Sequence, residues 1–217
     1  MAQRVPTLLA VIVLAAVGLR SCVATAQIQR ILALSAAGAS DELKHAVEDK
    51  GYRVTLDDGW TAEFWFVKRL KTTTKEVPGA LYPGLANAEF VGVVNLPKGM
   101  TDFRGQAIPA GAYTLRYQLL PQDGDHMGVS TYPDFLLAIP VTGDPNPDRS
   151  YLFKKLAALS AKSTGMNHPA VIALDSAGEP GSIVQGPQNL TVFTVAVATS
   201  GDATEKLGIV VKGTATQ

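Results

Sequence analysis

The residues best suited to chemistry lie in one polar loop and in one later segment. Asp123, Asp125 and His126 occur within a four-residue stretch, and His168 precedes a proline further along the chain. Carboxylates and imidazoles are natural ligands of divalent metal ions, and loops held by rigid sheets often carry sites. We therefore predict that Asp123, Asp125, His126 and His168 form a ligand-binding site, with a divalent metal ion as the candidate cofactor.

Simpler interpretations compete with this site. Asp123 and Asp125 can accept backbone N–H groups in an ordinary Asp-Gly turn. His168 has an extended backbone because a proline follows it, and its imidazole can hydrogen-bond to a neighbouring carbonyl. An EF-hand is disfavoured, because Met127 takes a ligand position and the flanking residues alternate like strands. The sequence leaves the metal site and the polar turn as alternatives.

Missing motifs exclude several functions. The sequence contains no GxGxxG, GxxxxGK[ST], HExxH or GxSxG pattern. Its single cysteine, Cys22, excludes a disulfide framework and a thiolate metal cluster. The 19 basic and 19 acidic residues balance, so we expect no basic stripe and no nucleic-acid partner.

Residues 1–26 have the features of a signal peptide. Arg4 supplies the positive charge, residues 5–19 form the apolar run, and residues 24–26 (Ala-Thr-Ala) form a small-residue cleavage site. The apolar run ends before the ~20 residues that a membrane-spanning helix needs. We expect an exported protein, periplasmic or extracellular, with no transmembrane helix in the mature chain.

A lipoprotein is the alternative for the same leader. In that interpretation Cys22 would be acylated after cleavage in front of it. The motif calls for a small or apolar side chain at the position of Arg20, so a removed signal peptide that ends at Ala26 is favoured.

Helical signals are few in the remaining chain. Residues 27–50 are predicted to form an N-terminal helical segment, in which Ser40 is the N-cap and Gly51 the C-cap of a short helix. Within that segment, residues 28–36 are either helical or an unsettled terminus. A second helix is predicted from about Ser150 to Ala161, because leucines recur there at helical spacing.

Residues 51–217 are predicted to form one β domain, because apolar and polar residues alternate along most of it. Residues 52–70 form a hairpin around Asp57-Asp58-Gly59, and 71–87 and 142–149 are loops. We expect about eight strands in an antiparallel β-sandwich or jelly-roll-like fold, with one or two short helices. The further predicted strands are 90–96, 113–119, 135–141, 170–174, 190–198 and 207–211.

Aromatic and charged residues inside these strands allow two further predictions. The aromatics form either core pairs, which alternation favours, or a face on which a sugar stacks. Glu63 and Arg116 each occupy the middle of a strand, and we expect them to pair on the polar face of the sheet. The aromatic residues are Trp60, Trp65, Tyr113, Tyr117 and Tyr132.

The segment 103–117, with its Pro-Ala-Gly-Ala-Tyr run at 109–113, resembles the Pro-Ala-Gly-x-Tyr strand of small exported bacterial all-β proteins of unknown function. The segments 123–128 (Asp-Gly-Asp-His-Met-Gly), 134–135 and 165–170 look like further signatures of such a group. The resemblance spans roughly residues 50–212 and implies an exported all-β domain. It implies no activity and no catalytic residue.

The leading functional hypothesis is a non-catalytic exported module that binds a small ligand, an ion or an envelope protein. The first alternative is a metal-assisted hydrolase, in which the same Asp and His residues hold a metal-bound water of lowered pKa. The second alternative is a purely structural envelope protein, which an exposed sheet edge or a large surface patch would favour.

Overall fold

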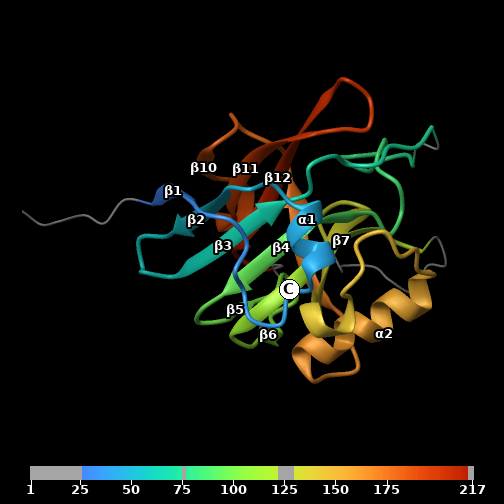
Figure 1. Cartoon of the computed structure of the whole chain (residues 1–217). Helices are drawn as coiled ribbons and strands as arrows, with labels where there is room; N and C mark the ends of the chain where they lie inside the picture. Colours follow the sequence, from blue (N-terminus) through green and yellow to red (C-terminus); the bar gives the residue numbers. More distant parts are fainter. Residues whose placement is uncertain (1–25, 75–76, 122–129, 215–217) are drawn as a thin grey trace, which may run out of the picture.

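The computed structural model describes residues 26–74, 77–121 and 130–214, and most of them belong to one antiparallel sheet (Figure 1). Ten strands in the order β1-β2-β3-β4-β7-β8-β9-β12-β11-β10 curl into a nearly closed barrel. The elements are β1 Gln27–Ile31, α1 Asp41–Ala46, β2 Gly51–Thr55, β3 Thr61–Phe66, β4 Phe90–Leu96, β5 Met100–Thr101, β6 Ala107–Ile108, β7 Gly111–Leu119, β8 Asp134–Pro140, α2 Phe153–Thr164, β9 Ala170–Asp175, β10 Ser182–Gln185, β11 Thr191–Ala198 and β12 Thr204–Lys212.

The β2–β3 hairpin shows how the sequence pattern builds this sheet. Gly59 supplies the left-handed backbone (φ +76°) that the turn needs. Strand alternation then directs Val54 and Phe64 into the barrel, while Arg53 and Glu63 lie opposite each other on the outer face. The predicted hairpin is confirmed.

Apolar side chains fill the barrel interior. The rings of Phe64, Phe66 and Phe193 pack with centroid separations of 5.5 to 6.3 Å, which joins β3 to β11 across the barrel. Each fully buried ring of this size contributes about 1.5–3 kcal/mol relative to exposure. The interior is therefore a packed core built from side chains of both halves of the sheet.

The two ends of the barrel differ. At the end where β7 finishes, the segment that contains Tyr82 and Leu85 folds into the interior and plugs it. The Tyr82 hydroxyl donates to the Asp175 carbonyl (3.2 Å) and accepts from the Gly208 N–H (2.7 Å), and burial raises the pKa of Tyr82 to about 12. At the opposite end, where β7 begins, the short β5–β6 flap lies beside an open mouth.

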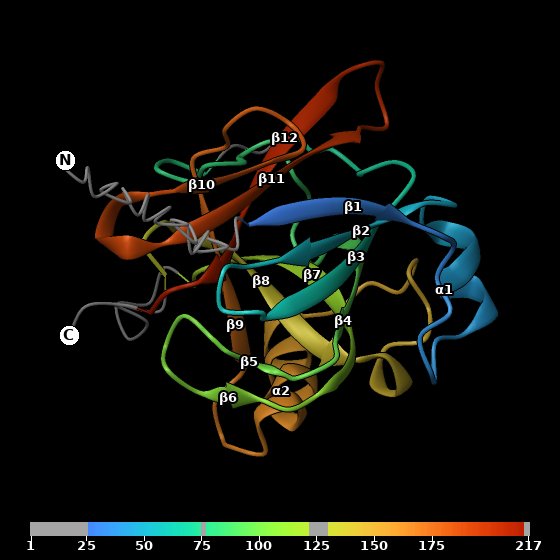
Figure 2. The same ribbon diagram turned by 90° about the vertical axis from the view of Figure 1, so that its left-hand side faces the viewer.

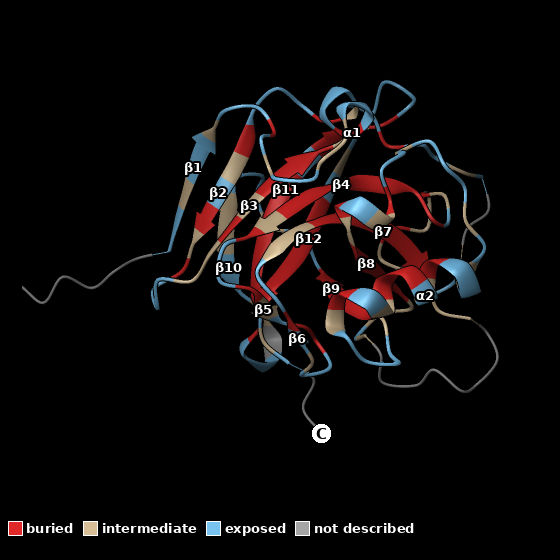
Figure 3. Cartoon of the chain, turned by 60° about the horizontal axis from the view of Figure 1, so that its bottom comes forward, coloured by how far each residue is buried: buried red, intermediate tan, exposed pale blue. Residues whose placement is uncertain are grey.

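The two helices cover separate parts of the outer face (Figure 3). The α2 side chains Leu156 and Leu159 pack on β8 and β9, and Gly165 ends the helix in a left-handed conformation. The α1 residue Leu43 packs near Trp65 of β3. In the described part of the chain, neither helix combines the length and the apolar character needed to span a bilayer.

The sheet has a seam between its edge strands, because β1 and β10 lie side by side without a shared ladder (Figure 2). Strand β10 pairs with Thr191–Thr194, and no other strand of the described residues pairs with the second half of β11 on that side. Ile28 of β1 and Ile183 of β10 pack on the interior core instead. Between β1 and β10 side-chain packing therefore closes the barrel, while at the end of β11 Leu70 adds backbone hydrogen bonds to Ala198 and Ser200.

The predicted mainly β, antiparallel fold is confirmed, but other predictions need correction. Ten strands form one sheet curled on itself instead of a two-sheet sandwich, and there are more strands than predicted. Within the predicted helical segment 27–50, Gln27–Ile31 is a strand, because its residues pair with β2. The helix capped by Ser40 is confirmed, but it ends at Ala46, since the buried Val47 is already extended and bridges to Val67.

Candidate functional site

Most of the predicted metal site lies outside the part of the chain that the structure describes. Asp123, Asp125 and His126 lie outside the described residues, so their part of the prediction stays a prediction. His168 is exposed on the connection from α2 to β9, and its backbone carbonyl accepts the Thr164 hydroxyl at 3.0 Å. Among the described residues, no group of three or more His, Cys, Asp or Glu side chains is placed to hold a metal ion.

The strand register shows where His168 lies relative to the two ends of the barrel. Leu119 pairs with Asp134 where β7 meets β8, next to the plugged end. Ala170, which follows the His168 segment, pairs with Ala138 toward the other end of β8. His168 therefore lies at the mouth side of the barrel.

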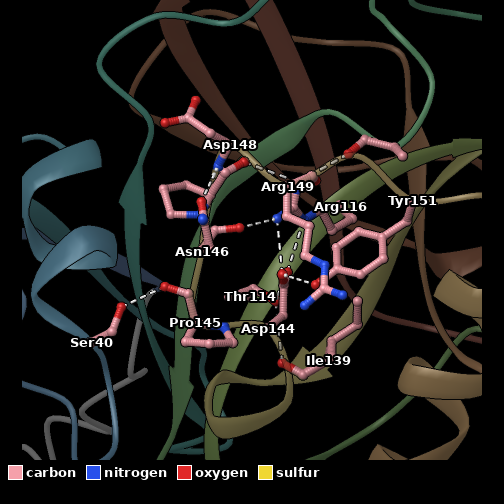
Figure 4. Close-up of polar contacts among 12 residues, drawn as sticks. Ser40, Thr114, Arg116, Ile139, Asp144, Pro145, Asn146, Asp148, Arg149 and Tyr151 are labelled. Atoms are coloured by element: carbon pink, nitrogen blue, oxygen red, sulfur yellow. Dashed lines mark hydrogen bonds and ion pairs between the residues drawn. The ribbon is translucent and has the colours of Figure 1, made fainter.

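A buried ion pair on the outer face is the most elaborate polar feature of the described chain (Figure 4). Arg116 of β7 is 1% exposed and Asp144 is fully buried. The guanidinium donates to both carboxylate oxygens, at 2.8 Å from Nε and 2.9 Å from Nη2. Thr114 and Tyr151 donate their hydroxyls to the same carboxylate, at 2.8 and 2.9 Å.

The rest of the guanidinium binds main-chain carbonyls. Nη1 donates to the carbonyls of Ala88, Pro147 and Arg149 at 3.1 to 3.2 Å. Nη2 donates to the Asn146 carbonyl at 2.8 Å. Because these carbonyls belong largely to residues 144–149, Arg116 fixes the shape of that loop.

The expected pair between Glu63 and Arg116 is wrong. Strand β4 lies between the strands of Glu63 and Arg116. Glu63 pairs with Asn95 of β4, and Asn95 pairs on its other side with Ala112 of β7, four residues before Arg116. Glu63 instead accepts a hydrogen bond of 2.7 Å from the guanidinium of Arg53, which lies on the neighbouring strand β2. The partner that sequence reasoning missed, Asp144, lies in a segment that was predicted only as a loop.

A first cleft, which we name the α1 cleft, lies between three parts of the chain. These are α1, residues 67–71 after β3, and the 144–149 loop that Arg116 holds. The volume of the cleft is about 280 Å³, and Lys71, Glu89 and Asp148 line it. The Lys71 ammonium binds Asp148 at 2.8 Å, and one oxygen of Glu89 accepts the Lys71 backbone N–H at 2.9 Å. Burial raises the pKa of the Glu89 carboxyl above its ordinary value.

A second cleft, which we name the mouth cleft, opens at the unplugged end of the barrel. It has a volume of about 480 Å³ and is formed by the β2–β3 turn, the flap and the last residues of β12. Trp60 lines it, half-buried, and also packs against the interior core. The indole N–H donates to the Gly99 carbonyl at 2.8 Å, which fixes the ring.

Charged groups surround this indole. Asp58 accepts the Trp60 backbone N–H at 2.9 Å and pairs with Lys212. The hydrogen bond from Lys212 lowers the pKa of the Asp58 carboxyl. Lys98 lies on the flap side and donates to the Gly59 carbonyl at 3.4 Å. The mouth cleft therefore combines an aromatic surface with two ammonium groups and one carboxylate.

The flap that forms one wall of the mouth cleft is held by a buried carboxylate. Asp102 is fully buried and accepts the backbone N–H groups of Gln106 (2.7 Å) and Val171 (3.2 Å). The Gln106 amide also donates to Asp102 at 2.8 Å. These bonds tie the flap to β9, so the wall facing Trp60 has a defined position.

The aromatic residues predicted for a sugar-stacking face do not lie together on one exposed surface. Trp65, Tyr113 and Tyr117 are buried, as the core interpretation of these residues predicted. Trp60 is the member of the set that lines the mouth cleft. Sequence alternation alone cannot distinguish it, because its partial exposure depends on the distant flap.

Comparison of this chain with protein-family models, with curated proteins and with solved structures gave no match.

Proposed function

We propose that this chain is an exported, non-catalytic binding module that takes a small acidic saccharide at the mouth of its barrel. The observation that carries the proposal is the fixed Trp60 indole in an open cleft with charged groups around it. Barrel mouths are common ligand sites, because the strands hold the surrounding loops in place.

The location of the site follows from the packing. The barrel interior is filled by side chains such as Phe64 and Phe193, and Tyr82 plugs the far end. A ligand therefore has room at the mouth, above the core. The Asp102 contacts hold the flap before binding, and such preorganisation lowers the entropic cost of binding.

The ligand class follows from the lining. A sugar ring presents C–H groups that pack on an indole face and hydroxyls that hydrogen-bond to charged side chains. Lys212 is neutralised by Asp58, which leaves Lys98 as the excess positive charge. We therefore expect an acidic saccharide to bind more tightly than its neutral counterpart.

The state of Asp58 favours binding over proton transfer. Its pKa is lowered by the hydrogen bond from Lys212 and by the Trp60 backbone N–H. The carboxylate therefore stays ionised and serves as a hydrogen-bond acceptor for ligand hydroxyls. The predicted leader at residues 1–26 supports a ligand that is encountered outside the cytoplasm, such as an envelope glycan.

The test is isothermal titration calorimetry of the purified protein with trigalacturonic acid and with neutral galactotriose. We expect the acidic probe to bind more tightly, and Trp60→Ala to weaken it at least about tenfold, which corresponds to ~1.4 kcal/mol. Lys98→Ala should reduce the preference for the acidic probe, whereas Lys154→Ala on the exposed face of α2 should leave it unchanged.

Two results would overturn the proposal. One is that neither saccharide binds the wild-type protein. The other is that Trp60→Ala binds both probes as the wild type does. Thermal unfolding followed by circular dichroism checks that each variant is folded, and Trp60→Phe keeps an aromatic ring at the site if Trp60→Ala does not fold.

A further inference from the structure

The second half of β11 has one residue whose backbone groups face an open edge. Ser182 pairs with Thr194, and the Leu70 N–H donates to the Ala198 carbonyl at 2.8 Å. Backbone groups of alternate residues in a strand point to the same side, so the N–H and C=O of Ala196 point there too. Among the described residues no hydrogen-bond partner faces them, and Ala196 is exposed.

A groove lies in front of Ala196, and we name it the seam groove. Its volume is about 220 Å³, and it separates Val195–Ala198 from Arg30 of β1 and from the start of β2. Tyr52 and Phe66 contribute apolar surface to its walls. The groove therefore offers unpaired backbone groups beside an apolar surface.

The rim of the seam groove carries cations without carboxylate partners. The Arg30 guanidinium lies 4.1 Å from the centroid of the Tyr52 ring, which orients it. In the described chain neither Arg30 nor Lys50 forms an ion pair. Glu48 also lines the groove, so the rim has one positive charge in excess.

The same two cations border a second surface. A groove of about 530 Å³ on the outer face of β1 also contains Arg30 and Lys50, together with Leu32. Leu32 is 84% exposed, directly after the end of β1. A chain that leaves the seam groove over β1 would therefore meet an apolar side chain.

We propose that the seam groove binds a short, extended, acidic segment of a partner protein. The segment pairs its main chain with Ala196 and places a carboxylate against Arg30 and Lys50. Addition of an extended segment to an open sheet edge is an established mode of peptide recognition, and a guanidinium can bind a carboxylate through two parallel hydrogen bonds. A second copy of this chain fits less well, because its own β1 would bring another Arg30.

Fluorescence anisotropy tests the proposal with an octapeptide of alternating Val and Glu, labelled at its N-terminus. We expect saturable binding to the purified protein, weakened at least tenfold by Arg30→Glu and by Lys50→Glu. Lys154→Glu, an equal charge reversal on α2, should bind as the wild type does. A peptide of alternating Val and Lys should bind the double variant Arg30→Glu/Lys50→Glu better than it binds the wild type.

A peptide methylated at its central backbone nitrogens separates strand pairing from charge attraction alone. Weaker binding of this peptide supports the proposal, whereas equal binding overturns it. Equal weakening by Lys154→Glu also overturns it. A concentration-dependent dimer of the wild type that Arg30→Glu abolishes would assign the groove to a second copy instead.

Discussion

The two sides of the barrel are built in different ways. On the β7–β9 side, the ladder is continuous, α2 covers the sheet, and the buried Arg116 and Asp144 satisfy each other. On the β1–β10 side, two edge strands meet without a ladder, and Arg30 and Lys50 have no carboxylate partners among the described residues.

This difference separates stability from binding capacity within one sheet. Buried, paired polar groups resist change because removing one member leaves the other uncompensated. Unpaired edges and exposed cations contribute little to stability, but they can accept a partner. Substitutions on the two sides should therefore change the free energy of unfolding by different amounts.

The largest effect is expected for Arg116→Met. This change leaves the Asp144 carboxylate buried without its cation, and it also removes four bonds to main-chain carbonyls. We expect a loss of about 3–5 kcal/mol in the free energy of unfolding, measured by urea denaturation. The double variant Arg116→Met/Asp144→Leu should recover part of this loss, because no unpaired charge stays buried. A loss below ~1 kcal/mol for Arg116→Met alone would contradict the assignment of stability to the β7–β9 side.

A smaller loss on the same side is expected for Ser160→Ala. The Ser160 hydroxyl donates to the Ala138 carbonyl (2.8 Å) and accepts the Ala170 N–H (3.0 Å), so it bridges α2 to β8 and β9. Its removal leaves a buried N–H unpaired, which costs about 1–3 kcal/mol in urea denaturation. Lys155→Ala on the exposed face of α2 is the control, and an equal loss there would show that the buried hydrogen bonds of Ser160 are not the cause.

Glu89 should make stability depend on pH. Burial raises the pKa of its carboxyl, so just above the ordinary carboxyl pKa the folded state holds a proton that the unfolded state has lost. Its contribution to the free energy of unfolding therefore falls as pH rises through this range. Glu89→Gln should remove the decline in denaturation curves recorded at several pH values, and an unchanged slope would show that other groups cause it.

The smallest effect is expected for Arg53→Met on the outer face near the seam. Arg53 pairs with Glu63 at 2.7 Å, but its side chain is 44% exposed. Such pairs contribute about 0–1 kcal/mol. A loss as large as that of Arg116→Met would mean that the two sides do not differ in the way described.

Most strands could be predicted from the sequence. Some, such as β2, alternate between buried and more exposed residues, and others, such as β8 and β9, are nearly continuous buried runs. Gly59 marked the hairpin turn, because the turn needs a left-handed backbone that glycine adopts without strain. The strand at 27–31 was not predicted, since its residues are mostly exposed and it is defined by pairing with β2. Alternation also cannot distinguish a barrel from a sandwich, because both bury every second residue.

The candidate sites were harder to predict, because they depend on contacts between distant segments. The sequence shows Trp60 as one of five aromatic candidates, but its role depends on Gly99, whose carbonyl accepts the indole N–H from the flap side. The sequence shows Arg116 as a charge within a strand, but its partner Asp144 lies in the loop that follows β8. Nothing in residue type or spacing specifies such pairs.

The seam also bears on how the chain folds. Strand β1 comes from the beginning of the described chain, while β10, β11 and β12 come from its end. Contacts of such high sequence separation carry a large loop-closure entropy, and folds rich in them fold slowly. The two edges can therefore meet only after nearly all of the polypeptide has emerged, which makes closure a late folding event and leaves both edges open to chaperones until then.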